Sequence, residues 1–138
     1  MGRLSVGDLG VICEALTVLA AASLLTRVTP FRTYVELGSI RLPHKQSPEA
    51  ARIAKIVDIV ADRVPFRAVC LQRGLALQWM LRRRGVDALL HYGIKIGLND
   101  LEAHVWVSVS GTVVIGAPQH VGFTEVTKYP SQVPKALA

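Results

Sequence analysis

The chain has 138 residues, of which 51% are hydrophobic and only 19% are charged. This length and composition exclude a disordered tail and indicate one domain with a real core. The net charge of +6 is spread along the chain, with eight basic and six acidic residues up to residue 63 and eight and four beyond it, which favours acidic ligands over a nucleic acid.

The two cysteines, Cys13 and Cys70, lie far apart in the chain. Neither belongs to a CxxC pair, and no histidine stands at metal-ligand spacing from them. We therefore expect neither a metal site nor a disulfide framework, and we expect a reduced, cytoplasmic protein.

The first predicted element is an apolar helix that Ser5 or Asp8 caps and that ends near Thr26. Its apolar run, residues 11–28, resembles a signal or membrane segment in composition. Glu14 interrupts this run, and the single arginine before it is balanced by Asp8. We expect a buried or amphipathic helix that is covered on two faces, with membrane association as an alternative.

A helix break follows, because Pro30 cannot continue the helical pattern. Residues 31–37 are predicted to form a short second helix, and residues 38–46 a loop. Ser47 is a suitable N-cap for the next helix, with Pro48 at its first position. The apolar residues of that helix fall on one side: Ile53, Ile56, Val57 and Val60.

The stretch from Pro65 to Gly85 contains the most informative helix. Pro65 disfavours an earlier start, so the helix is predicted to begin just before or at Cys70 and to end before Gly85. Its apolar and small residues cover an arc of roughly 160°, which predicts a mostly buried helix. Cys70 then lies in the first turn, where unpaired backbone N–H groups favour the nucleophilic thiolate.

After this helix the hydrophobic period changes from 3.6 to 2, which indicates strands. Asn99 and Asp100 mark a turn within residues 97–101, and Ser110 and Gly111 mark a hairpin. The predicted strands are 89–96, 104–109, 112–115 and a short one around 121–126.

A nucleophilic cysteine needs a base, usually an imidazole, within hydrogen-bond reach. His44 lies in a predicted loop, His120 in the proline-rich tail, and His91 in a strand. His104 begins a strand and shares a face with Trp106. We predict that the start of the Cys70 helix packs against the sheet and brings the sulfur and the His104 imidazole together.

Three stretches resemble a known family: 70–77 (CLQRGLAL), 81–86 (LRRRGV) and 103–107 (AHVWV), followed by the Gly111 hairpin. They resemble the transglutaminase-like cysteine proteases of lasso peptide biosynthesis. More narrowly, they resemble the standalone leader peptidase, the protease half of a split B protein. The likeness covers about residues 65–123.

This resemblance implies an α+β fold with a transglutaminase-like, papain-like core at residues 47–138. In that fold a central helix carrying the cysteine packs on an antiparallel sheet of about four strands. The N-terminal helical region, residues 1–46, is then a candidate for partner docking within the same single domain.

The resemblance also implies catalytic roles. Cys70 attacks the peptide bond that ends the leader, and His104 acts as base and then as acid. The family usually has an Asp that orients the histidine, but Gly116 stands at that position here. A dyad or a substituted triad is therefore expected, and the candidate replacements are His120, Glu102, Glu125, a backbone carbonyl or water.

Two further residues are candidates for substrate binding. Trp106 is either part of the core or a wall of the substrate groove. Gln72 either assists the oxyanion or satisfies buried polar groups. The resemblance implies no cofactor and no metal, and it implies three partners: a precursor peptide, a separate leader-recognition protein and a lasso cyclase.

Three alternatives remain at this point. One is another Cys/His acyl transferase, such as a transglutaminase or a deamidase. The second is a non-catalytic peptide-binding scaffold, which Gly116 in place of the acid suggests. The third is a membrane-anchored protein.

Overall fold

The computed structural model of the chain describes residues 5–30, 33 and 49–129. Three predictions fall outside the described part: the helix at 31–37, of which only residue 33 is described, the loop at 38–46 and the Ser47 cap. The described elements, in chain order, are η1 (Val6–Asp8), α1 (Leu9–Val28), α3 (Ala50–Ala61), α4 (Cys70–Arg83), β1 (Ala88–Ile96), β2 (Leu101–Val109), β3 (Thr112–Ile115), η2 (Gln119–Gly122) and β4 (Thr124–Tyr129).

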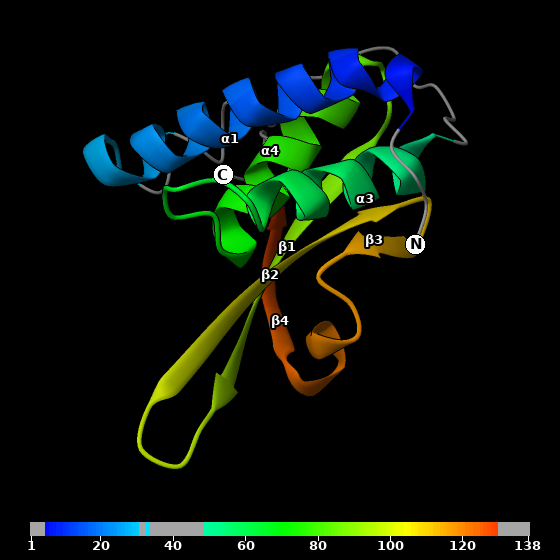
Figure 1. Cartoon of the computed structure of the whole chain (residues 1–138). Helices are drawn as coiled ribbons and strands as arrows, with labels where there is room; N and C mark the ends of the chain where they lie inside the picture. Colours follow the sequence, from blue (N-terminus) through cyan, green and yellow to red (C-terminus); the bar gives the residue numbers. More distant parts are fainter. Residues whose placement is uncertain (1–4, 31–32, 34–48, 130–138) are drawn as a thin grey trace.

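The strands form one antiparallel sheet in the order β3-β2-β1-β4. The helices α1, α3 and α4 lie on one side of this sheet (Figure 1). α4 packs on β1 and β2, α3 packs on β3 and α4, and α1 packs on α3 and α4. The arrangement confirms the predicted α+β architecture, with the cysteine-bearing helix against the sheet.

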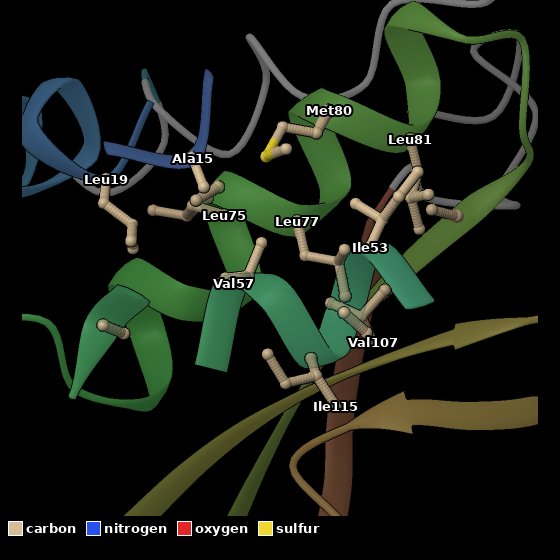
Figure 2. Packing of buried hydrophobic residues seen from close by; sticks show 14 of the residues in the cluster. Ala15, Leu19, Ile53, Val57, Leu75, Leu77, Met80, Leu81, Val107 and Ile115 are labelled. Carbon is tan, nitrogen blue, oxygen red and sulfur yellow. The ribbon is translucent and has the colours of Figure 1, made fainter. Parts of the chain in front are cut away.

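The core forms where the three helices meet the sheet (Figure 2). α4 is buried on most sides, as its wide apolar arc predicts, because α1 and α3 cover the faces that the sheet does not. Fully burying a leucine stabilises the fold by about 1.5–3 kcal/mol. The fully buried side chains of the core include Leu19, Ile53, Val57, Leu75, Leu77, Met80, Leu81 and Val107.

β1 and β2 form a long hairpin, with Ala88 opposite Val109 and Ile96 opposite Leu101. Its tip extends away from the helices (Figure 1). The next hairpin turns at Ser110 and Gly111, which both have positive φ, as a tight two-residue turn requires. Both predicted turns are confirmed.

Two predictions are wrong. The strand expected around 121–126 begins at Thr124 instead, because residues 119–122 form the 3-10 helix η2 and β4 pairs with β1 only beyond it. The two-sided cover expected for the first helix is also absent, since Leu9, Leu24 and Val28 remain exposed on α1 in the described structure. Among the described helices, only Val6–Val28 is long and apolar enough to span a membrane, and 22% of it is buried.

Candidate active site

Cys70 is the first residue of α4, and local hydrogen bonds explain why the helix begins there. Val69 is extended, so its backbone cannot continue a helix toward the N-terminus. The side-chain oxygen of Gln72 accepts a hydrogen bond from the Val69 N–H at 3.1 Å, and its amide donates to Thr26 Oγ1 at 3.1 Å. Gln72 therefore caps α4 and ties it to the end of α1, which is the second of the two roles that the sequence analysis left open for it.

Arg73 holds the loop that precedes Cys70. Its Nε donates to the carbonyl of Ala68 at 2.8 Å, and its terminal nitrogens reach Asp58 at 3.0 Å and Asp62 at 2.6 Å. One guanidinium thus joins the end of α3, the 62–69 loop and the first turn of α4. Burial lowers the pKa of Arg73, but the hydrogen bonds to both aspartates outweigh it and leave the pKa above its ordinary value.

The Cys70 side chain is partly exposed and opens into a cavity of about 480 Å³. This volume lies within the usual range for small-ligand sites. The first turn of α4 contributes backbone N–H groups without helical partners, which can bind an anion beside the sulfur. The cavity is lined by Thr26 and Arg27 of α1, Arg67 and Val69 of the loop, Cys70, Leu71 and Gln72 of α4, and Tyr92, Ala103 and Val105 of the sheet.

The structure places His104 on the other face of the sheet. Ala103 and Val105 line the Cys70 cavity, and side chains alternate along a strand, so His104 points away from α4. Its imidazole instead lies beside Trp106, with ring centroids 6.0 Å apart, and against Phe123 at 5.2 Å. The predicted meeting of Cys70 and His104 is therefore not formed here.

Trp106 shares this outer face. It is buried between His91, whose ring stacks on it at 5.5 Å, and His120 at 5.8 Å. It does not line the cavity beside Cys70. Trp106 therefore packs at the centre of the outer face, which agrees with the first of its two predicted roles, and Tyr92 rather than Trp106 lines the cavity.

A backbone carbonyl occupies the position of the missing carboxylate. His104 Nε2 donates to the carbonyl oxygen of Gly116 at 2.8 Å. In a neutral imidazole this bond places the hydrogen on Nε2 and leaves Nδ1 as a hydrogen-bond acceptor. The Gly116 position excludes a side chain, since a Cβ there would lie 2.6 Å from Trp106 Cβ and 2.9 Å from the Val105 oxygen.

The other candidates for the third residue have different partners. Glu102 pairs with Lys95 at 3.1 Å, and His120 packs on Trp106. Glu125 bonds to Nδ1 of His91 rather than to His104.

A histidine network that the sequence did not predict lies beside them. His91 bonds to the Glu125 carboxylate through Nδ1 and to Ser108 Oγ through Nε2, at 2.7 Å for the latter. This order of groups is that of a serine hydrolase triad, but Ser108 is only 6% exposed. A buried hydroxyl cannot reach a peptide, so the network stabilises the outer face. Within the described residues, no group of three or more His, Cys, Asp or Glu side chains is placed to hold a metal.

The sequence analysis also missed the four other lining residues with polar side-chain groups: Thr26, Arg27, Arg67 and Tyr92. They come from α1, a loop and β1, so no local motif unites them. Tyr92 alone carried a signal that could have been used, because it shares a strand face with Leu90 and Ile94, and an apolar strand face packs on the core.

A sequence model described as the transglutaminase-like superfamily matches residues 15–128. The chain belongs to this superfamily. No curated protein and no solved structure matches it. Transglutaminase-like domains are in general cysteine peptidases or acyltransferases, and a cysteine in the first turn of a buried helix beside a cavity fits such an activity.

Proposed function

We propose that this transglutaminase-like protein is a thiol-dependent peptidase that removes the leader from a ribosomally made lasso precursor peptide. The observation that carries the proposal is the position of Cys70, in the first turn of α4 at the edge of the cavity of about 480 Å³. The sequence stretches around Cys70 and His104 supply the link to leader peptidases.

The proposed reaction has two steps. The Cys70 thiolate attacks the carbonyl carbon of the last leader residue, and backbone N–H groups of the first turn of α4 stabilise the oxyanion. The thiol proton passes through the His104 imidazole to the leaving amine of the core peptide. Water then hydrolyses the thioester, which releases the leader as a carboxylic acid and restores Cys70.

This mechanism requires His104 to reach the cavity side of the sheet when the substrate is bound. Because β1 and β2 pair regularly through Gly93 and His104, this step involves a rearrangement of the sheet and not of the side chain alone. The Nε2 bond to Gly116 suits the role of a base, since the imidazole keeps Nδ1 free to accept a proton.

We further propose that a separate leader-recognition protein delivers the precursor and that a lasso cyclase receives the freed core peptide, all in the cytoplasm. These partners follow from the resemblance of the sequence stretches. The exposed side of α1, with Leu9, Leu16 and Leu24, offers an apolar surface for docking them.

A second candidate is a non-catalytic peptide-binding scaffold. It is favoured by one observation, the placement of Cys70 and His104 on opposite faces of the sheet. On this hypothesis the cavity binds a peptide, and the thiol takes no part in bond cleavage.

The deciding experiment is incubation with a candidate precursor and its leader-recognition protein, followed by mass spectrometry. The wild type is compared with Cys70→Ala and His104→Ala, and with His120→Ala as a control histidine on the same outer face. A peptidase shortens the precursor, and a scaffold leaves it unchanged. A transglutaminase gives an isopeptide product whose mass is that of the joined reactants less one ammonia.

We expect loss of the nucleophile to reduce cleavage by at least about 10³-fold, and loss of the base to do so to a similar degree, because the two act as a unit. His120→Ala should retain activity. Normal trimming by Cys70→Ala would rule the proposal out. Normal trimming by His104→Ala would remove His104 from the mechanism and leave the base to another group.

A further inference from the structure

Two arginines stand out by their lack of partners. Every other arginine in the described part of the chain bonds to a carboxylate or a carbonyl oxygen: Arg52, Arg63, Arg73, Arg82, Arg83 and Arg84. Arg27 and Arg67 form no hydrogen bond or ion pair within the described structure. These same two arginines line the cavity beside Cys70.

The cavity brings the two arginines to the border of one space. Arg27 comes from the last turn of α1 and Arg67 from the loop before α4, so they approach from different elements. Among the described residues, no acidic side chain lines the cavity to neutralise them. Arg27 also complements the C-terminal end of the α1 dipole, but Arg67 lies in a loop, where no helix end accounts for its charge.

The rest of the lining is largely apolar, with Val69, Leu71, Tyr92 and Val105. Such a surface suits an apolar peptide segment, while guanidinium groups bind carboxylates through charge-assisted, often bidentate hydrogen bonds. The free N–H groups of the first turn of α4 add positive potential on the same side. An anion in this cavity would therefore be attracted from three directions.

We propose that Arg27 and Arg67 form a carboxylate-binding subsite that selects peptides with an Asp or Glu side chain next to the bond that Cys70 attacks. This assignment deepens the proposed function and rests on Cys70 acting on a peptide. It names the substrate class as acidic peptides and gives the two arginines a role in specificity, not in bond cleavage.

The test uses two alkylating probes that differ only in charge, iodoacetate and iodoacetamide. In each, the Cys70 thiolate displaces iodide from the reagent carbon. Cys13→Ser is the background, so that Cys70 is the only thiol. The quantity measured is the ratio of the iodoacetate rate to the iodoacetamide rate, relative to the same ratio for 2-mercaptoethanol. A change in thiolate fraction affects both rates equally, so the ratio reports only the charge of the reagent.

We expect the ratio to be several-fold higher for the protein than for 2-mercaptoethanol. A unit charge about 7 Å away in water changes the energy of an anion by about RT, which corresponds to a roughly threefold change in rate. Arg27→Gln and Arg67→Gln should therefore each lower the ratio roughly threefold. The double variant should lower it roughly tenfold. Arg63→Gln is the matched control, since it removes the same charge from an exposed arginine outside the cavity. Its ratio should stay unchanged.

A second measurement needs no variant. The elevated ratio of the Cys13→Ser protein should fall as ionic strength rises, because salt screens exposed charges. A ratio that equals that of 2-mercaptoethanol, or that Arg63→Gln lowers as much as Arg67→Gln does, would overturn the subsite. This outcome is independent of cleavage, so it is distinguishable from failure of the proposed peptidase activity.

The source of the carboxylate is tested by protection. N-acetyl-aspartate amide, N-acetyl-asparagine amide and N-acetyl-asparagine with a free carboxylate are compared, at equal millimolar concentration, for slowing of Cys70 alkylation by iodoacetamide. Protection by the aspartate amide alone supports a side-chain carboxylate. Protection by the free α-carboxylate alone, or equal protection by all three, would contradict the proposal.

Discussion

Gly116 is predicted to be irreplaceable for steric reasons, and Gly116→Ala tests this. The backbone there has φ of +92°, a conformation that costs a residue with a side chain about 1–2 kcal/mol. The added Cβ would also lie 2.6 Å from Trp106 Cβ and 2.9 Å from the Val105 oxygen, neither of which is the flexible end of a side chain. Such overpacking costs typically about 1–3 kcal/mol. The sum predicts a loss of about 2–5 kcal/mol in the free energy of unfolding.

The measurement is urea unfolding followed by circular dichroism, with Gly111→Ala as the matched control. Gly111 also has a positive φ, of +80°, but a Cβ there meets nothing within 4 Å. The control therefore reports the conformational cost alone, about 1–2 kcal/mol. If Gly116→Ala lost no more stability than Gly111→Ala, the steric part of the reasoning would be refuted.

Three further predictions concern α1 and α4. Gly74→Ala should lower the free energy of unfolding by about 1–3 kcal/mol, because its Cβ would lie 2.8 Å from a valine methyl of β2. Gly10→Ala has open space around it and should raise the free energy of unfolding by up to about 1 kcal/mol. Urea unfolding of both variants tests this contrast. The side-chain hydrogen bond from Arg84 outweighs burial and lowers the pKa of Glu14 from 4.5. Glu14→Gln should therefore reduce the free energy of unfolding by about 1 kcal/mol at pH 7. This difference from wild type should shrink as pH falls below about 4.5, because protonation of Glu14 removes the stabilising charge. Arg73→Lys should lower the free energy of unfolding by about 1–2 kcal/mol, because an ammonium cannot reproduce the three directed hydrogen bonds of the guanidinium. The loop before Cys70 should then become more accessible to proteolysis. An unchanged proteolytic cleavage pattern would contradict this prediction.

Much of the fold was predictable because its signals are local. Pro65 and the apolar arc after it predicted a buried helix beginning at Cys70, and α4 begins there. The alternation of residues 89–96 and the Ser110-Gly111 turn predicted two hairpins, and both are present. The strand expected around 121–126 was placed too early, since pairing with β1 rather than local propensity decides where β4 begins.

The site was less predictable because it is assembled from distant segments. Arg27 and Arg67 are separated by α3 in the chain and meet at one cavity only because α1 packs on α4. The carbonyl of Gly116 accepts the His104 N–H in place of the expected acid. A backbone carbonyl was among the predicted replacements, but side-chain chemistry could not say which carbonyl it would be. Residue type alone could therefore name Cys70 and His104 but not their surroundings.

The sequence by itself determined which residues of β2 share a face, because the two-residue period sets His104 with Trp106 and Val105 with Val107. Only the tertiary structure decided which of these faces meets the cysteine helix. Gly74 has no side chain, so α4 approaches β2 closely enough to contact Val105 and Val107. That contact directs the valines toward α4 and the imidazole of His104 to the other side. A periodic pattern fixes the grouping of side chains, but only packing orients the strand.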